Sequence, residues 1–503
     1  MVKKYLQSLI LFLIFVLVFL SLITLSVFSQ RLPLINKQNK TLMQTFYWEL
    51  AKDKYAVQYP EENNLWNLLS KKALKLADLG ITGVWLPPAN KAAGGINDEG
   101  YAAYDLWDLG EFKQKDSIRT KYGSKKELLK AVDSLHKNGI KVYYDAVLNH
   151  RMGGDSQEVV SLASGERTNF WTRFEMAGRE KYFDKANDWN WGWQAFDSAD
   201  GRLLKGKNWD DTADDDYLMG NDVDYQNLKV EEELIEWGKW IVNDIGFDGF
   251  RLDAVKHIDR LFVNNWINAV QGETDKDLIF MGEAWYENSM GLYFYLLGMN
   301  NEDLTVFDFS LRKQFSLMRD GNLNMSSLTK AGLVNKSGLG ERVITFVDNH
   351  DTGRDEVEYT TPIFQRKYQA YTYIMTREMG IPMLYWKDYY ISGLKEGLDK
   401  IVKARKYFAY GPGYEVNNND SNVYSYVRAG LKDVPGTGLV MMIAGGDTKS
   451  IISKEINSCQ ANQQFYDFTG NVKGIVETNA KGIGQFKVIN SEKKGWSIWV
   501  PQG

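Results

Sequence analysis

Short runs of apolar, β-branched and aromatic residues alternate with amphipathic stretches from about residue 41 to about residue 395. Eight of the runs have the length of buried strands, and apolar residues spaced by three and four between them are typical of helices. This alternation predicts an α/β protein built on a (β/α)8 barrel. The predicted strands are 41–48, 83–89, 142–150, 247–255, 278–285, 304–311, 342–352 and 381–388, and the clearest helices are 62–79, 125–138, 230–244 and 362–379.

Two regions break this alternation. After His150, some eighty residues are rich in Gly, Asp, Asn and Trp and contain no clear helical pattern. A loop of that length needs structure of its own, so we predict a small inserted domain at 151–225, after the third strand. From about residue 397, short strand-like runs are separated by Gly, Asn and Asp, which predicts a C-terminal antiparallel β-sandwich over 397–503. The barrel would then comprise 41–150 and 226–395.

Composition narrows the classes of partner. The 503 residues carry a formal net charge of −5 and no long basic run, which disfavours nucleic acid as a partner. Aromatic residues make up 14% of the chain, and their rings suit stacking on sugar faces as well as core packing. A single cysteine, Cys459, excludes an intrachain disulfide. We expect a monomer.

The N-terminus has the pattern of an export segment. Lys3 and Lys4 precede an apolar run from Leu9 to Phe28, interrupted only by Ser21, Thr24 and Ser26. Its twenty residues exceed the usual core of a signal peptide and are close to the length of a membrane-spanning helix. Residues 1–30 are therefore either a signal peptide, cleaved near Val27-Phe28-Ser29, or a retained membrane anchor. In both cases we expect the remainder outside the cytoplasm, secreted or anchored, with membrane contact only through this segment.

Four predicted strands end in acids, histidines or an arginine. The sequences are DAVLNH (145–150), GFRLDAVKH (249–257), GEAW (282–285) and VDNHDT (347–352), and three of the four histidines of the chain lie in them. A single acid at a strand end is more often a helix cap, and an Arg-x-Asp pair is often a plain ion pair. Four such ends at one barrel mouth are better explained by an active site, since barrel enzymes build their sites there.

The residue types fit glycoside hydrolysis, which needs one ionised and one protonated carboxyl group. Arg251 and Asp253 alternate along a strand and share a face, so the guanidinium keeps Asp253 ionised as a nucleophile. Neighbouring carboxylates would raise the pKa of Glu283, making it a proton donor and then a general base. Asp351 would bind sugar hydroxyls and favour the oxocarbenium-like distortion, with His150 and His350 donating hydrogen bonds to the same hydroxyls.

These four blocks, in this order and spacing, resemble the signature regions of the α-amylase family of glycoside hydrolases. Further segments resemble its bacterial liquefying endo-α-amylases, namely LMQTFYW (42–48), GYAAYDLWDLGEF (100–112), KYG (121–123) and KARK (403–406), and the similarity runs from about residue 41 to the C-terminus. The resemblance implies an endo-hydrolase of internal α-1,4 bonds in starch- or glycogen-type glucans that retains anomeric configuration through a covalent glycosyl-enzyme intermediate. It implies catalysis by Asp253 (nucleophile), Glu283 (acid/base) and Asp351 (transition-state stabiliser), and substrate binding by Tyr101, His150, Arg251, Lys256, His257, His350, Trp48 and Trp285.

A second acidic group lies in the predicted inserted domain, in the segment 209–224. On its own this cluster could be a solvated loop, although its oxygen ligands suit Ca²⁺. The resemblance implies one structural calcium held by Asn149, Asp216, Asp222 and the backbone carbonyl of His257. It also implies an adjoining cation site at Asp197 and Asp210, with Asp224 a weaker candidate. Gln226 stands where an acid is expected, and the segment before Asp216 is shorter than in the family.

Three other functions fit parts of the sequence. A membrane-anchored, non-catalytic amylase-like accessory protein would suit the N-terminal apolar run, but such proteins lose the acids that this chain keeps. A transglycosylase or glucosidase would use the same three acids, and the liquefying-type flanking segments favour endo-hydrolysis over it. A purely carbohydrate-binding protein would not need a proton donor opposite a nucleophile.

Overall fold

The computed structural model describes residues 39–183, 189–210, 217–355, 362–417 and 419–502. Within it, eight parallel strands close into a barrel in the order β1-β16-β15-β14-β13-β12-β5-β2. The (β/α)8 barrel predicted from the sequence is therefore confirmed. The strands are β1 (Leu42–Gln44), β2 (Gly83–Trp85), β5 (Lys141–Ala146), β12 (Gly249–Leu252), β13 (Ile279–Gly282), β14 (Leu304–Phe307), β15 (Val343–Thr345) and β16 (Ile381–Tyr385).

Each observed strand is shorter than the predicted one, and all but β5, which begins one residue earlier at Lys141, lie within the predicted bounds. The difference falls mostly at the carboxyl ends, where the chain leaves the ladder and carries polar side chains toward the barrel mouth. The predicted strand 304–311 also included the first turn of helix α9 (Phe309–Arg319), whose apolar residues 309 and 311 are buried against the barrel. A short apolar run does not by itself distinguish the two states.

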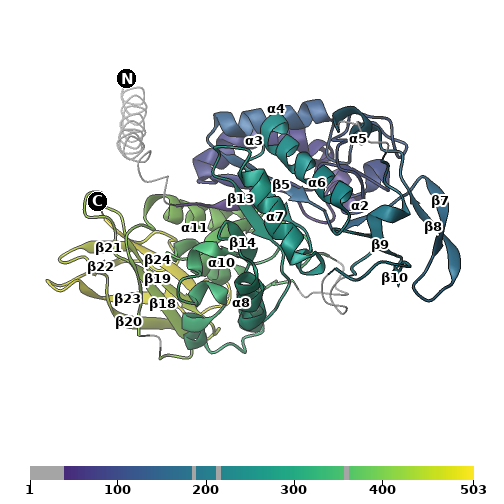
Figure 1. Ribbon diagram of the computed structural model, residues 1–503. Helices are drawn as coiled ribbons and strands as arrows, with labels where there is room; N and C mark the ends of the chain where they lie inside the picture. Colours follow the sequence, from purple (N-terminus) through teal and green to yellow (C-terminus); the bar gives the residue numbers. More distant parts are fainter. Residues whose placement is uncertain (1–38, 184–188, 211–216, 356–361, 418, 503) are drawn as a thin grey trace, which may run out of the picture. The chain divides into compact units, whose positions relative to one another are not determined.

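Helices surround the barrel (Figure 1), and α11 (Lys395–Tyr407) packs on α3 (Leu65–Leu79), which joins the two ends of the ring. In α4 (Lys125–Lys137) Ser124 and Glu127 form a capping box, and the buried residues Leu128, Ala131, Val132 and Leu135 form the face toward the barrel. The remaining helices of the ring are α6 (Leu228–Trp240), α7 (Arg260–Gln271), α8 (Ser289–Gly298), α9 and α10 (Lys367–Thr376).

The region after the third barrel strand forms its own small sheets, as expected for an insertion. A four-stranded sheet has the order β10-β9-β11-β6, and β7 (Ser156–Ser161) pairs with β8 (Arg167–Arg173) as a separate hairpin (Figure 1). The sheet strands are β6 (His150–Arg151), β9 (Phe196–Ala199), β10 (Arg202–Leu203) and β11 (Asn221–Val223). One short helix, α5 (Ala177–Tyr182), was not predicted from the sequence.

The C-terminal part is an antiparallel six-stranded sheet, ordered β17-β18-β19-β24-β21-β22, faced by the pair β20-β23. Buried apolar residues such as Val440, Phe486 and Trp499 fill the space between them, so the predicted β-sandwich is present. The boundary expected at residue 397 falls inside α11, and the first sandwich strand is β17 (Gly413–Glu415). The other strands are β18 (Val423–Arg428), β19 (Leu439–Ala444), β20 (Ile451–Asn457), β21 (Gln464–Asp467), β22 (Ile475–Glu477), β23 (Ile483–Ile489) and β24 (Trp496–Pro501).

The predicted export segment and the loop containing Asp216 lie outside the described residues. Among the residues that are described, no helix combines the length and the apolar character needed to cross a bilayer.

Candidate active site

A single buried guanidinium connects the acids of three neighbouring barrel strands. Arg251 Nη1 donates to Asp145 Oδ1 at 2.7 Å and to Asp253 Oδ1 at 2.6 Å, and Arg251 Nη2 pairs with Glu283 Oε1 at 2.7 Å. The Arg251 side chain is 1% exposed. Charge-assisted bonds of this kind fix carboxylate orientation as well as charge.

The parallel register explains why these groups meet. Arg251 on β12 lies opposite Asp145 on β5, and side chains two residues apart share a face of a strand, which places Asp253 beside Arg251. The ladder continues past the strand ends, since Asp253 N donates to Ala146 O and Glu283 N donates to Leu252 O, both at 3.0 Å.

The surroundings of Glu283 act in opposite directions on its pKa. Its Oε2 accepts a hydrogen bond from the backbone of Ala254 at 3.1 Å, and Ala254 adopts a left-handed conformation with φ of 46°. Burial raises the pKa of Glu283 to about 8, and the charges of Asp253 and Asp351 add to burial while Arg251 opposes it. At neutral pH Glu283 is therefore protonated and able to donate a proton.

Asp351 reaches the same site from the loop after β15. Asn349 Oδ1 accepts hydrogen bonds from Asp351 N at 3.0 Å and from Thr352 N at 2.8 Å, which fixes the turn. Burial alone would raise the pKa of Asp351, but His350, Arg354 and Arg251 lower it below its usual value. Glu283 and Asp351 thus share one pocket with pKa values displaced in opposite directions.

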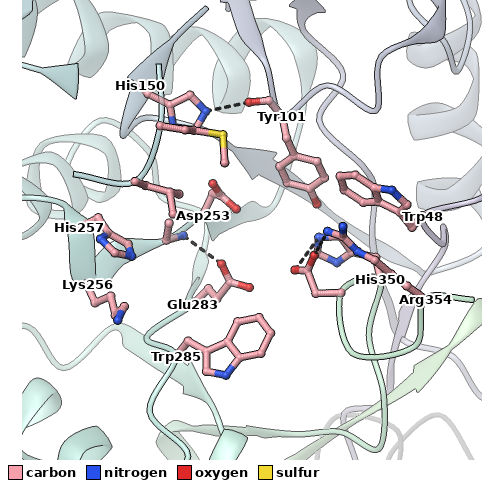
Figure 2. A pocket seen from close by; sticks show the side chains of 14 residues that line it. Trp48, Tyr101, His150, Asp253, Lys256, His257, Glu283, Trp285, His350 and Arg354 are labelled. Carbon is pink, nitrogen blue, oxygen red and sulfur yellow. Dashed lines mark hydrogen bonds and ion pairs between the residues drawn. The ribbon is translucent and has the colours of Figure 1, made fainter. Parts of the chain in front are cut away.

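A pocket of about 380 Å³ opens above these acids (Figure 2). It is lined by all the predicted catalytic and substrate-binding residues except Arg251, which lies beneath the surface. The lining residues are Trp48, Tyr101, His150, Leu218, Met219, Asp253, Ala254, Lys256, His257, Glu283, Trp285, His350, Asp351 and Arg354.

Aromatic rings form one wall of the pocket. Tyr101 is nearly parallel to His350, with ring centroids 5.0 Å apart, and Trp48 stacks on Tyr101 at 6.0 Å. The Tyr101 hydroxyl donates to Asp145 Oδ2 at 2.7 Å. Trp285 stacks on Phe309 at 4.6 Å, so one of its faces is used in packing.

Both predicted histidine donors have protein acceptors in this structure. His150 Nε2 lies 2.9 Å from the Tyr101 carbonyl, which can only accept, so the Nε2 hydrogen points there. The Gln44 amide nitrogen donates to His350 Nδ1 at 3.0 Å, leaving His350 Nε2 to donate to Asp351 Oδ2 at 3.2 Å. The acceptors expected from the sequence were sugar hydroxyls. Burial explains the difference, since a buried N–H needs an acceptor within the protein.

Sequence reasoning missed several members of the site. Asp145 lies in one of the four sequence blocks, but no role was assigned to it from the sequence. In the structure it orients Arg251 and Tyr101. Burial raises the pKa of Asp145 to about 6. Gln44 and Arg354 carry no motif of their own. The three-residue spacing between Asp351 and Arg354 was the available signal for Arg354. Leu218 and Met219 reach the pocket from the insertion, which no periodicity could place.

The acids of the insertion also converge. Carboxylate oxygens of Asp197, Asp210 and Asp224 all lie within 4.8 Å of one another, close enough to share a cation. Burial raises the pKa of Asp197 to about 10, and the charges of Asp210 and Asp224 add to it. Lys207 pairs with Asp224 and donates to the Gln194 carbonyl at 2.8 Å.

The residues expected around the first calcium are described only in part. Asn149 is fully buried, and its Oδ1 has no hydrogen-bond partner among the described residues. Asp222 lies on β11, which pairs with His150 next to Asn149. His257 follows β12 in the sequence and lines the pocket, and Asp216 falls outside the described residues.

Comparisons with known proteins give one consistent result. Residues 69–390 match the family model "Alpha amylase, catalytic domain". The chain is 36% identical to an α-amylase of Bacillus licheniformis over 490 residues, 90% of this chain and 92% of that protein. It is also 36% identical to a glucan 1,4-alpha-maltohexaosidase of Bacillus sp. (strain 707), covering 92% of this chain and 93% of that protein.

A cytoplasmic α-amylase of Escherichia coli is 32% identical, over 92% of this chain and 99% of that protein. Among solved structures, the α-amylase of Geobacillus thermoleovorans complexed with acarbose superposes with a TM-score of 0.62 at 18% identity. That match covers 93% of this chain and 99% of the other, and at such identity it supports the fold alone.

Proposed function

Because this chain belongs to the α-amylase family of glycoside hydrolases, we propose that it is an endo-acting amylase. Its substrate is the internal α-1,4-glucosidic bond of starch- and glycogen-type glucans. The observation that carries the proposal is the pairing of Glu283, whose pKa is raised to about 8, with Asp253, which is bound to the same Arg251 guanidinium. One proton donor and one oriented carboxylate in a single pocket are what glycoside cleavage requires.

The proposed reaction proceeds in two steps with retention of configuration. Asp253 attacks the anomeric carbon while Glu283 protonates the leaving oxygen, so the glycosidic bond breaks as the bond to Asp253 forms. Glu283, now ionised, removes a proton from water, which hydrolyses the glycosyl-enzyme and releases Asp253. Asp351 binds sugar hydroxyls, and the Tyr101 and Trp48 rings offer faces on which glucose units stack. His257 and Lys256 contact the leaving side.

The first experiment compares reducing-end release with viscosity loss on soluble starch, for the wild type and Glu283→Gln. In the wild type we expect viscosity to fall early with few new reducing ends. In the variant the rates of viscosity loss and of reducing-end release should both be lower by about 10²–10⁴-fold, because protonation by the acid is lost. Glu287→Gln is the matched control, since Glu287 is an exposed acid paired with Lys313 at 2.8 Å. No release by the wild type would end the hydrolase proposal, and longer products formed from short glucans would indicate a transglycosylase.

We propose one structural calcium at Asn149, Asp216, Asp222 and the His257 carbonyl, between the insertion and the barrel. The buried Asn149 Oδ1 without a partner among the described residues supports it, since a hard cation prefers such an oxygen. We propose a further cation at Asp197, Asp210 and Asp224, because carboxylate oxygens of these three residues lie within 4.8 Å of one another. Chelation of the metal should lower the melting temperature and increase amide exchange in β9 and β11 before it does so in β15. Equal protection with and without chelator would contradict the calcium proposal.

We also propose export, with the enzyme monomeric and outside the cytoplasm. The support is the Lys3-Lys4 start and the apolar run that follows. Mass spectrometry of the N-terminus separates the two forms: a mature start near residue 30 indicates a secreted enzyme, and an intact N-terminus in the membrane fraction indicates an anchor. An intact N-terminus in the soluble fraction would contradict both.

A further inference from the structure

Arg354 is placed in the pocket by the turn that carries Asp351. Gly353 N donates to the Asn349 carbonyl at 2.9 Å, and Lys387 Nζ donates to the Gly353 carbonyl at 2.9 Å. A side chain at 353 would bring its Cβ within 2.7 Å of the Tyr385 ring and 2.9 Å of Asn349 O, so glycine allows the turn to close tightly. Arg354 therefore leaves the turn in a fixed direction.

Two contacts hold the Arg354 side chain. Its Nη2 pairs with Asp351 Oδ1, and its guanidinium carbon lies 3.5 Å from the centroid of the Trp48 ring (Figure 2). Trp48 is itself stacked on Tyr101 and on His350, so the guanidinium rests on a fixed surface. A planar cation between an aromatic face and a carboxylate loses little freedom on binding, which makes it an effective clamp.

The other groups near Asp351 do not supply this contact. Burial lowers the pKa of His350 to about 3, so this imidazole is neutral at pH 7 and contributes a hydrogen bond without a charge. Arg251 already binds three carboxylates. Other titratable groups of the same pocket are Glu283 and Tyr101, whose pKa values are raised so that both are neutral at pH 7, together with Asp253, Lys256 and His257.

We propose that Arg354 is a positioning residue for Asp351: its guanidinium lies on the Trp48 ring and holds this carboxylate toward the sugar at the point of cleavage. The inference rests on the proposed role of Asp351. Arg354 is not required for proton transfer or for covalent bond formation. Arg354 affects the geometry and charge of Asp351, so its replacement should change the rate of the chemical step more than it changes substrate affinity.

The charge has a consequence for pH. Burial raises the pKa of Asp351, while His350, Arg354 and Arg251 lower it, and Arg354 acts both by its charge and by a direct hydrogen bond. Without Arg354, Asp351 takes up a proton at higher pH, and the acidic limb of kcat/KM moves upward. One charge in direct contact with a carboxylate moves its pKa by about 1–3 units.

The test compares kcat and KM over pH 4–9 for the wild type, Arg354→Gln, Arg354→Lys and Lys54→Gln. Lys54 is the matched control, because it is a mouth-side cation paired with Asp355 at 3.2 Å and makes the same change in net charge. We expect Arg354→Gln to lower kcat by about tenfold or more, with KM changed less than about threefold and the acidic limb moved up by about one unit. Arg354→Lys should restore the position of the limb, and Lys54→Gln should match the wild type.

A uniform loss at every pH in Arg354→Gln would overturn the proposal, as would a Lys variant no closer to the wild type than the Gln variant. Circular dichroism and melting temperature are measured in parallel. If Arg354→Gln does not fold, the test rests on Arg354→Lys, whose acidic limb of kcat/KM must lie at the wild-type pH if the proposal holds. An inactive wild type would refute the proposed function, whereas an active wild type with unchanged Arg354 variants would refute this inference alone.

Discussion

Glu283 and Asp351 are both buried carboxyl groups in one pocket, yet their neighbours move their pKa values in opposite directions. Burial dominates for Glu283, because the cation that pairs with it, Arg251, is shared with two other carboxylates. Asp351 has the imidazole of His350 on one oxygen and Arg354 on the other. Separation of two acids by their surroundings is how a glycosidase keeps a proton donor and an ionised group together at one pH.

The first prediction concerns the alkaline limb of kcat/KM. Since the pKa of Glu283 is raised to about 8, the acid is protonated below that pH and activity declines as pH rises through it. A maltooligosyl fluoride needs no proton on its leaving group, so its first step should not decline near pH 8, while that of an ordinary maltooligosaccharide should. An identical decline for both substrates would assign the limb to a group other than Glu283.

The second prediction concerns Arg251. Replacement by Met leaves Asp145, Asp253 and Glu283 buried without their shared cation, which should cost about 3–5 kcal/mol of unfolding free energy and abolish activity. Arg251→Lys retains the charge but cannot bridge three acceptors, so it should fold better and remain at least about 10²-fold impaired. Urea denaturation and starch hydrolysis measure the two effects.

Arg202→Met is the control for that experiment. Arg202 pairs with Glu166 at 2.6 Å, but both side chains are largely exposed, so the change should be within about 1 kcal/mol. If Arg251→Met were as stable as this control, the three acids would not depend on Arg251 for their burial.

At the level of helices and strands, repetition made the barrel predictable. All eight strands were found because each is a buried run bounded by polar residues, and the acids at their ends followed from the barrel rule. Helix α8 is not among the clearest helices predicted from the sequence, since its apolar residues are spread round its circumference and Phe294 and Leu297 are exposed. Contacts between distant segments, such as Trp48 with Arg354, have no signature in a single sequence.

A third prediction concerns the register of β12 on β13. Gly249 has φ of 140°, and a Cβ there would lie 2.1 Å from the Ile279 carbonyl oxygen of the neighbouring strand. Gly249→Ala should therefore displace the start of β12 and destabilise the protein by about 3 kcal/mol or more. Gly139→Ala is the control, because Gly139 also has positive φ (72°) but nothing within 4 Å of the added carbon, so it should cost about 1 kcal/mol.

For the variants Gly249→Ala and Gly139→Ala, a measurement of activity distinguishes displacement of strand β12 from a general loss of stability. Since β12 carries Arg251 and leads to Asp253, a shift of the strand moves both relative to Glu283. At a temperature well below its melting temperature, Gly249→Ala should have a lower kcat than the wild type. Gly139→Ala should keep the wild-type kcat under the same conditions. Full activity of folded Gly249→Ala would show that the strand accommodates the methyl group without moving the acids.

Across the molecule, the barrel and the C-terminal sandwich share a hydrophobic core. Helix α10 packs on β19 and β24, and one continuous group of buried residues includes barrel side chains together with Tyr424, Met441 and Ile498. Composition indicated where the sandwich begins only approximately, because α11 is amphipathic and its polar face resembles a surface segment. The change in residue composition along the sequence indicates a change of fold type. It does not indicate whether the barrel and the sandwich unfold separately.

The last prediction follows from this shared core. Arg377, just after α10, donates to Glu415 Oε1 at 2.6 Å and to the Tyr424 hydroxyl, and it is buried between barrel and sandwich. Arg377→Met should cost about 2–4 kcal/mol, because charge-assisted bonds are lost and buried acceptors remain. Since the core is continuous, hydrogen exchange should speed up together in β15 of the barrel and β19 of the sandwich. Faster exchange in β19 alone would mean that the sandwich opens independently, and Arg377 would then stabilise only the sandwich.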